Sequence, residues 1–358
     1  MQIELPISKS IANRLLILQA IHGDGLVTVS CDMPDDVQIL HNALTTLRTF
    51  KTFKTLSTPH IDVGNCGTAM RFLTAYCAQL EGQTTILDGV ERMHHRPIGQ
   101  LVDALREIGA DIEYLGEEGF PPLRIKGKAL DKSKPITLNT PQSTQFVSAL
   151  LLISANVQTD STSPYITLTR EIIDQYPIAH RASNSPHCGR PIAAQAASSL
   201  EKDWSSAAFW YEYVALHGGE ITLPGLHKDS LQGDKVVADI FAHLGVSTQY
   251  TEDGIQICRS QTILNSKFLI QNFSACPDLY PAVALTCERL GVEIHATGVE
   301  SLPLKESDRL RAVAEHRTDA DHRMAMALLI AGYEVDDTAC ISKSYPQFLE
   351  QFRQLQYS

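Results

Sequence analysis

Apolar strand-like runs alternate with amphipathic helical patterns along most of this chain. Three such pairs are Gln2–Leu5 before Ile11–Ala20, Thr84–Leu87 before Ile98–Ile108, and Ile221–Leu223 before Val236–Leu244. Alternation of this kind is typical of folds that mix sheets with helices, and it excludes an all-helical chain. We therefore predict an α/β (α+β) fold.

One junction recurs along the chain: a predicted helix ends at a glycine and a strand follows. It occurs at residues 105–111 and 241–247, and less clearly at 289–292. Glycine suits this position because it adopts the left-handed conformation that ends many helices. The recurrence indicates an internal structural repeat. Such junctions are also common in any mixed fold, so both interpretations stand.

A glycine turn that leads into a helix is the first feature with candidate chemistry. The run from Gly64 to Arg71 feeds a predicted helix at Thr68, after which apolar residues recur at helical spacing up to Leu80. Glycine lets the backbone approach a ligand, and a helix start offers free N–H groups and the positive end of the dipole. Arg71 and Arg96 add charge and forked donors. Together these features predict an anion site.

Four further segments place small polar residues where a helix is predicted to begin: 8–10, 143–145, 203–206 and 306–309. Each is compatible with an ordinary N-cap, because Ser, Thr and Asp dominate such positions. Several of these starts also carry a cation, namely Lys9, Arg14, Lys305 and Arg309. A cation there opposes the helix dipole unless an anion binds between them. We therefore predict that these helix starts bind anions.

These motifs resemble the enolpyruvyl transferase family, most closely its shikimate branch, the 5-enolpyruvylshikimate-3-phosphate synthases. The resemblance runs from Lys9 to about Pro346 and includes the runs at 321–326 and 342–346. It implies two similar domains, each built from three repeated sheet-and-helix units, with the active site in the cleft between them. On this chain, one domain would span 9–248, and the other would combine 1–8 with 249–358.

The reaction implied by the resemblance moves the enolpyruvyl group of phosphoenolpyruvate onto the 5-hydroxyl of shikimate 3-phosphate and releases phosphate, on the way to chorismate and aromatic amino acids. It needs a base for the hydroxyl and an acid for the methylene carbon. Asp278, Lys305 and Glu306 are the candidates, although Asp278 also fits a helix cap after Pro277. We expect no metal and no cofactor, because lysines and arginines can neutralise the phosphate charge.

Substrate contacts are likewise implied by the resemblance. Arg14 would bind the carboxylate of shikimate 3-phosphate, and Ser143, Thr144 and Ser206 would bind its phosphate. The full set for this substrate is Lys9, Ser10, Arg14, Ser143, Thr144, Gln145, Ser206, Asp278 and Lys305. The set for phosphoenolpyruvate is Lys9, Gly67, Arg96, Gln145, Arg309, Arg323 and Lys343. Within it, the forked guanidinium groups of Arg309 and Arg323 match the two oxygens of a carboxylate.

Composition sets broad limits on the function. The chain has 358 residues, 44% of them apolar, and a net charge of −11, which argues against a nucleic-acid surface. No apolar run is long enough to span a membrane. The eight cysteines are scattered without paired spacing, so we expect reduced thiols rather than disulfides or a zinc site. We predict a cytoplasmic enzyme, a monomer, whose partners are small anionic substrates.

Several positions depart from the family pattern. Phe72 stands where the family has proline, Thr144 replaces a serine, and Phe209 replaces a tyrosine. The largest departure is the segment 311–320, where the family has a further helix-and-strand excursion, and residues 183–199 match nothing that we can place. Either the chain is a trimmed family member or loops are missing from the sequence.

Two other functions stay open at this point. The first is enolpyruvyl transfer to a UDP-amino sugar, UDP-N-acetylglucosamine, which Cys66 favours. The Ser-Thr-Gln run at 143–145 and the Lys-Glu-Ser-Asp-Arg run at 305–309 favour the shikimate branch instead. The second is a trimmed, non-catalytic relative that binds anions or only keeps the fold. A turnover assay separates an enzyme from a scaffold.

Overall fold

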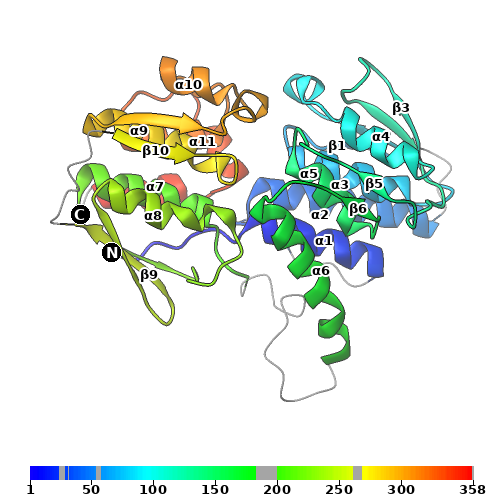
Figure 1. The fold of residues 1–358 in the computed structure, drawn as a ribbon, viewed down its shortest axis with the longest axis horizontal. Helices are drawn as coiled ribbons and strands as arrows, with labels where there is room; N and C mark the ends of the chain where they lie inside the picture. The colour runs from blue at the N-terminus through cyan, green and yellow to red at the C-terminus, as the bar shows by residue number, and fades with distance from the viewer. Residues whose placement is uncertain (24–28, 31, 54–57, 183–199, 261–267, 357–358) are drawn as a thin grey trace. The chain divides into compact units, whose positions relative to one another are not determined.

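A computed structural model describes residues 1–23, 29–30, 32–53, 58–182, 200–260 and 268–356. The chain divides into two compact units (Figure 1). The N-terminal unit comprises residues 10–31 and 36–199. The C-terminal unit comprises residues 1–9, 32–35 and 200–358. The unplaced segment 183–199 lies outside the described residues.

Two long helices open the N-terminal unit, and a four-stranded mixed sheet follows, in the order β1-β2-β4-β3. β1 and β2 run parallel, and the other two pairings are antiparallel. The elements up to this sheet are α1 (Lys9–His22), α2 (Asp35–Phe53), β1 (His60–Asp62), α3 (Gly67–Ala78), β2 (Thr84–Asp88), η1 (Glu91–His95), α4 (Gly99–Glu107), β3 (Asp111–Tyr114) and β4 (Leu123–Lys126). Helices α3 and α4 pack on the sheet.

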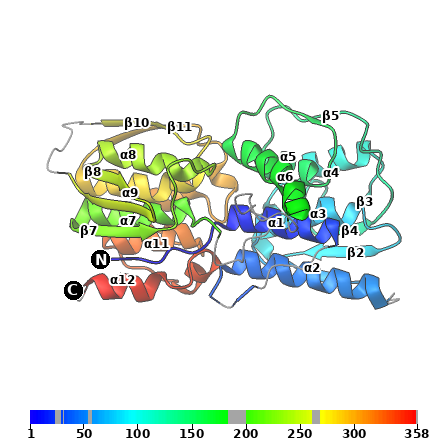
Figure 2. The same cartoon turned by 90° about the horizontal axis from the view of Figure 1, so that it is seen from below.

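The rest of the N-terminal unit is a two-stranded parallel pair with two helices. Its elements are β5 (Ile136–Thr137), α5 (Thr144–Leu152), β6 (Val157–Gln158) and α6 (Pro164–Ala182). Helix α5 packs on both α3 and α6, a contact that can be followed in Figure 2. Eleven of the twelve residues of α3 are buried, so this helix is covered on all sides rather than along the single stripe that its spacing predicted.

The C-terminal unit is built on an antiparallel sheet in the order β7-β9-β8 and a parallel pair, β10-β11. Its strands and the helices among them are α7 (Trp204–His217), β7 (Glu220–Pro224), η4 (Gly233–Val236), α8 (Val237–His243), β8 (Val246–Tyr250), β9 (Gly254–Arg259), β10 (Phe268–Asn272), η5 (Pro277–Leu279), α9 (Tyr280–Leu290) and β11 (Glu293–Thr297). The last five elements are η6 (Leu302–Leu304), α10 (Arg309–Glu315), α11 (His322–Ala331), η7 (Ala339–Lys343) and α12 (Phe348–Gln356).

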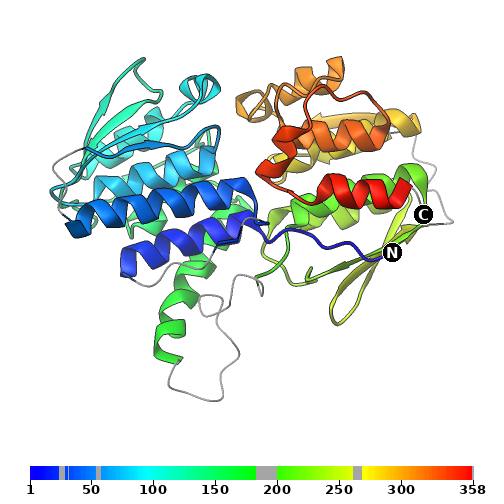
Figure 3. The ribbon, with the colours of Figure 1, turned by 180° about the vertical axis from the view of Figure 1, so that it is seen from behind.

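Helix α7 forms the centre of the C-terminal core. It packs on α9, α11 and α8, and Phe209, Trp210 and Tyr211 are each at most 1% exposed. Helix α12, red in Figure 3, packs Phe348 edge-on against Phe209 and at a tilt against Trp210. The aromatic run on α7 is therefore core. Within the described part of the chain, no helix is long and apolar enough to cross a membrane.

The helix–glycine–strand junctions predicted from the sequence are confirmed. Gly109, Gly245 and Gly291 follow α4, α8 and α9 with φ of 103°, 86° and 69°, and a strand begins after each. A side chain would strain the backbone in this left-handed region, which explains the repeated glycine. One junction lies in the N-terminal unit and two lie in the C-terminal unit.

Two expectations need correction. The domain boundary expected between residues 248 and 249 falls inside β8, whose five residues all pair with β9, and residues 200–248 belong to the C-terminal unit. The strand expected at Gln2–Leu5 is reduced to a single bridge between Gln2 and Thr222 of β7.

Candidate active site

In the C-terminal unit, charged residues gather at the ends of short helices. Asp278 lies in η5, Lys305 directly follows η6, Arg309 is the first residue of α10, and Arg323 lies in the first turn of α11. Lys343 is the last residue of η7. The sequence separation between the first and last of these residues exceeds 60 positions, so only the fold brings them together.

The carboxylate of Asp278 is shared by three cations. Its oxygens lie 2.8 Å from Arg309 Nη1, 2.9 Å from Arg323 Nη2 and 3.3 Å from Lys305 Nζ. Burial alone would raise the pKa of this carboxyl, but the charges of Arg323, Lys305 and Arg309, together with Lys9, outweigh burial and hold the pKa well below its ordinary value. Asp278 makes no helix-cap hydrogen bond, so the alternative interpretation as a cap is not supported.

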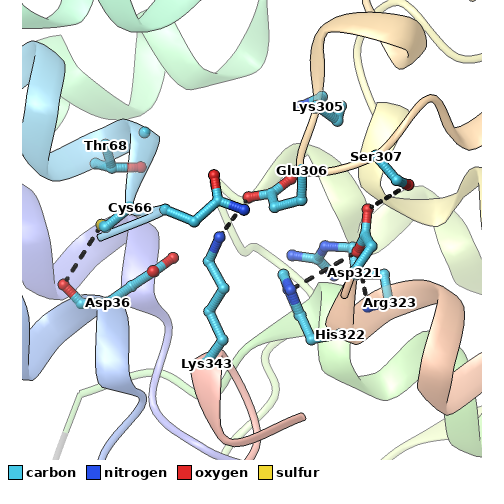
Figure 4. Close-up of polar contacts among 12 residues, drawn as sticks. Asp36, Cys66, Thr68, Lys305, Glu306, Ser307, Asp321, His322, Arg323 and Lys343 are labelled. Carbon is cyan, nitrogen blue, oxygen red and sulfur yellow. Dashed lines mark hydrogen bonds and ion pairs between the residues drawn. The ribbon is translucent and has the colours of Figure 1, made fainter. Parts of the chain in front are cut away.

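Two more carboxylates complete this charged cluster. Asp321 accepts from Arg309 Nε at 2.8 Å and from Ser307 Oγ at 3.2 Å, and it also caps α11. Glu306 lies 3.2 Å from Arg309 Nη2 and 2.9 Å from Lys343 Nζ (Figure 4). Arg309 therefore contacts three carboxylates, which raise its pKa although burial would lower it. Burial lowers the pKa of Lys305, and Asp278 offsets this only in part.

Two buried residues of the C-terminal unit, Arg323 and Ser206, have donor atoms without a partner among the described residues. Arg323 is 1% exposed, yet its Nε and Nη1 make no hydrogen bond, and the Ser206 hydroxyl is also buried and unpaired. Such groups are rare in folded proteins, because a buried donor without an acceptor destabilises the folded state by about 1–3 kcal/mol. Unpaired guanidinium nitrogens and an unpaired hydroxyl are groups that can donate hydrogen bonds to an anion.

His322 is a further candidate that the sequence did not assign. Its ring is fully buried beside Asp321, and neither nitrogen has a hydrogen-bond partner in the described residues. Burial, with the charges of Lys9 and Arg323, holds the pKa of the imidazole well below its ordinary value, so it is neutral at physiological pH. From the sequence, an Asp-His pair alone is no more than ordinary architecture, and only its burial singles this histidine out.

In the N-terminal unit, two arginines enclose the start of α3. Arg71 Nη1 donates to Gly67 O at 3.2 Å, and Arg96 Nη1 donates to Asn65 O at 3.2 Å. A side chain on Gly67 would lie 2.5 Å from Arg96 Nη2 and 2.7 Å from Arg71 Nη1. The helix start is capped by Cys66, whose Sγ accepts from Ala69 N at 3.4 Å and contacts Asp36 O (Figure 4). A side chain at this position would therefore displace a guanidinium group, which glycine avoids.

The start of α5 is tied to the start of α3. Gln145 Nε2 donates to Thr68 Oγ1 at 2.9 Å, so two predicted phosphate-binding helix starts lie next to each other in this unit. Ser143 is the N-cap of α5 and accepts from Gln145 N at 3.3 Å, and Thr144 is the first helical residue. This geometry is that of an ordinary N-cap, so the contact between Ser143 and a substrate phosphate stays a prediction.

Arg14 lies in the N-terminal unit and is only 3% exposed. Its Nη1 donates to the carbonyl of Ser10 at 2.7 Å. Lys9 belongs to the C-terminal unit, where its charge acts on both Asp278 and His322. The predicted site residues therefore form two groups. The N-terminal group is Ser10, Arg14, Gly67, Arg96, Ser143, Thr144 and Gln145, and the C-terminal group is Lys9, Ser206, Asp278, Lys305, Glu306, Arg309, Arg323 and Lys343.

The charged cluster consists of carboxylates with lysines and arginines. The described residues contain no group of three or more His, Cys, Asp or Glu side chains arranged to hold a metal ion. The positive charge of the cluster comes instead from lysines and arginines that lie within 2.8–3.3 Å of carboxylate oxygens. Such an arrangement can bind phosphate and carboxylate groups directly.

Comparison with known proteins points to one family. The sequence model of EPSP synthase (3-phosphoshikimate 1-carboxyvinyltransferase) matches residues 1–318 and 313–352. A 3-phosphoshikimate 1-carboxyvinyltransferase of Bacteroides fragilis strain ATCC 25285 is 36% identical over 405 positions, covering 98% of this chain and 94% of the relative. The enzyme of that name from Cellvibrio japonicus is 31% identical, covering 99% and 96%.

A solved structure shows the same fold. The EPSP synthase of Acinetobacter baumannii superimposes with a TM-score of 0.65 at 18% sequence identity, covering 99% of this chain and 95% of the other. The Bacteroides alignment runs over 405 positions, more than the 358 residues of this chain, and the two matched segments of the family meet at 313–318. The aligned relative therefore carries residues that this chain lacks, and the family match is divided within the segment 311–320, which departs from the family pattern.

Proposed function

Because the chain belongs to the EPSP synthase family, it is an enzyme that transfers the enolpyruvyl group of phosphoenolpyruvate to shikimate 3-phosphate, and we propose how its residues divide that work. The reaction releases phosphate and belongs to the shikimate pathway, which leads to chorismate and the aromatic amino acids. In this chain the two groups of site residues supply the cations for two anionic substrates.

Phosphoenolpyruvate binds, in this proposal, through its carboxylate to Arg323 and Arg309. The supporting observation is that two nitrogens of Arg323, the buried Nε and Nη1, have no partner in the described residues. Arg309 has all three nitrogens engaged by carboxylates. A ligand carboxylate must therefore compete with Asp278 and Glu306 for Arg309, whereas on Arg323 only Nη2 is engaged, by Asp278 and Ser205. The phosphate group contacts Lys9, Gly67, Arg96, Gln145 and Lys343.

Shikimate 3-phosphate binds through hydroxyl groups and cations. Ser143, Thr144 and Ser206 hold its phosphate, and the unpaired buried hydroxyl of Ser206 supports this assignment. Gln145, whose amide is tied to Thr68, bridges to phosphoenolpyruvate. Lys9, Ser10 and Arg14 act on the carboxylate end, and Asp278 with Lys305 contacts the ring hydroxyls.

Proton transfer follows from the pairing of Asp278 with its three cations. In the ligand-free state its depressed pKa makes it a poor base. When anionic substrates pair with Arg309 and Arg323, Asp278 loses part of that stabilisation. Its pKa then rises toward the operating pH, where a general base is effective. The hydroxyl oxygen adds to C2 of the enol as its proton leaves and a proton is delivered to the methylene carbon. Loss of a proton from the resulting methyl group expels phosphate. Lys305 and Glu306 are the remaining acid–base groups.

The carboxylate assignment can be tested by the Michaelis constants. Phosphate release from phosphoenolpyruvate is followed with shikimate 3-phosphate, with UDP-N-acetylglucosamine in its place, and with neither. We expect turnover with shikimate 3-phosphate only. Arg323→Lys should raise KM for phosphoenolpyruvate about tenfold or more, because an ammonium cannot present two parallel donors. An unchanged KM for phosphoenolpyruvate in this variant would contradict the assignment.

We also propose a monomer that acts in the cytoplasm. The six described cysteines, Cys66, Cys77, Cys258, Cys276, Cys287 and Cys340, are free thiols, which fits a reducing compartment. Analytical ultracentrifugation tests the oligomeric state, and a sedimentation coefficient above that of a 39.4 kDa monomer would contradict it.

A further inference from the structure

Arg14 is a buried cation without a counter-charge in the described residues. The side chain is 3% exposed, and no carboxylate of the described chain forms an ion pair with it. Burial lowers the pKa of its guanidinium to about 10, so the group still carries its charge at neutral pH. An unpaired buried charge is costly, so the surrounding residues must compensate by other means.

Neutral acceptors from three helices surround this guanidinium. Nε donates to Thr169 Oγ1 at 2.7 Å, and Nη1 donates to Ser10 O at 2.7 Å. Nη2 donates to Ser148 Oγ at 3.1 Å and to Tyr165 O at 3.3 Å. An arginine has five N–H groups, so these contacts leave a single hydrogen on Nη1. The orientation of the group is thus determined before any ligand arrives.

One face of the same guanidinium is covered by an aromatic ring. The central carbon of Arg14 lies 5.5 Å from the ring centroid of Phe72, which is 1% exposed and belongs to α3. This distance is within the range of a cation–π contact, and the ring supplies partial negative charge without accepting a hydrogen bond. Among the described contacts, the remaining N–H on Nη1 is therefore the donor that Arg14 has left for a ligand.

Thr169 is itself held rigidly. Its hydroxyl donates to the carbonyl of Tyr165, one turn earlier in α6, at 2.7 Å, and lies 2.9 Å from Ser148 Oγ. The residue is completely buried. From these contacts we infer that Thr169 and Phe72 are positioning residues, which fix Arg14 in the orientation that binds the carboxylate of shikimate 3-phosphate. This inference rests on the proposed role of Arg14.

The first test removes the hydroxyl of Thr169. Thr169→Val should raise KM for shikimate 3-phosphate about tenfold, equivalent to about 1.4 kcal/mol, while KM for phosphoenolpyruvate and kcat stay within about threefold. Thr169→Ser keeps the hydroxyl and should restore the parent KM. Thr74→Val is the matched control: this threonine is also completely buried and also donates to a carbonyl one turn back, at 2.7 Å, but it makes no contact with Arg14.

A second variant keeps the inference testable if Thr169→Val does not fold. Phe72→Leu retains an apolar side chain but removes the ring, and it should raise KM for shikimate 3-phosphate about threefold. The smaller side chain leaves a cavity in the core, so the melting temperature should fall by a few degrees. An unchanged KM for shikimate 3-phosphate in a folded Phe72→Leu variant would contradict the role of Phe72. If Thr169→Val changes all kinetic constants no more than Thr74→Val does, or if Thr169→Ser fails to rescue it, the positioning role is wrong. A parent enzyme whose rate does not depend on shikimate 3-phosphate would instead contradict the proposed function.

Discussion

Replacing Asp278 by asparagine would test the charged cluster most directly. The carboxylate contacts Arg309, Arg323 and Lys305 at 2.8–3.3 Å, and 22% of its side chain is exposed. Breaking a fully buried ion pair costs about 3–5 kcal/mol, and exposed pairs cost less than 1 kcal/mol. Because Asp278 is partly exposed and asparagine keeps one acceptor, we expect a loss of about 2 kcal/mol, or about 4–8 °C in melting temperature.

The chemical consequence should be larger than the structural one. An amide cannot accept the hydroxyl proton of shikimate 3-phosphate, and loss of a positioned base typically lowers a rate by about 10²–10⁴. Binding of that substrate should weaken by no more than about tenfold, since the amide keeps the size of the carboxylate and part of its hydrogen bonding. Turnover would be measured by coupled phosphate release, and binding by titration calorimetry.

The control for this substitution is Asp308→Asn. Asp308 caps α10 by accepting from Arg311 N at 3.3 Å, and asparagine caps a helix equally well. This variant should keep both its melting temperature and its turnover. If Asp278→Asn lowers the melting temperature but leaves kcat within about tenfold, the carboxylate only holds the cations, and Glu306 becomes the leading base.

Three further substitutions test separate parts of the structure. Gly67→Ala should weaken phosphoenolpyruvate and its phosphonate mimics about tenfold with the fold intact, because the new methyl displaces the guanidinium of Arg96, which lies 2.5 Å away; unchanged inhibition by a phosphonate would argue against it. Arg96→Lys should raise KM for phosphoenolpyruvate about tenfold, since a point charge cannot replace a fork; normal Michaelis constants for both substrates would leave Arg96 a purely structural role. Glu212→Gln should stabilise the protein increasingly above the ordinary glutamate pKa, by up to about 1.4 kcal/mol per pH unit, with no gain near pH 4. Burial raises the pKa of Glu212, so the folded carboxyl stays protonated while the unfolded one ionises; parallel stability profiles for parent and variant would refute this.

Local patterns predicted local structure well. The apolar spacing after Thr68 and at 98–108 located α3 and α4, and the recurring glycine junctions located the helix ends. These signals depend only on neighbouring residues, because helix ends and turn conformations have sequence preferences of their own. The same reasoning could not assign residues 200–248 to a unit. Helix α7 is buried on all sides, so its sequence has no stripe to show which neighbours it packs against.

The sequence predicted which charged residues belong to the site, but not which of them form pairs. The sequence places lysines and arginines at several predicted helix starts. A cation at that position opposes the helix dipole unless an anion binds there, which is why these residues were predicted to bind anions. Nothing in the sequence shows that Arg309 has every nitrogen engaged while Arg323 keeps two unpaired ones. Distances within a folded cluster decide this: Arg309 contacts Asp278, 31 positions away, as well as Asp321, 12 positions away.

The residues on either side of the segment 311–320 lie close together, because both contact the carboxylate of Asp321. This carboxylate accepts from Arg309 Nε at 2.8 Å before the segment and from Arg323 N at 3.0 Å after it. Between these points the chain needs only α10 and a turn in which His316, Asp319 and Ala320 have positive φ. Because both ends of the segment are bound to one buried side chain, its length can change without moving either arginine. A trimmed family member can therefore keep the arginine pair on which its proposed chemistry depends.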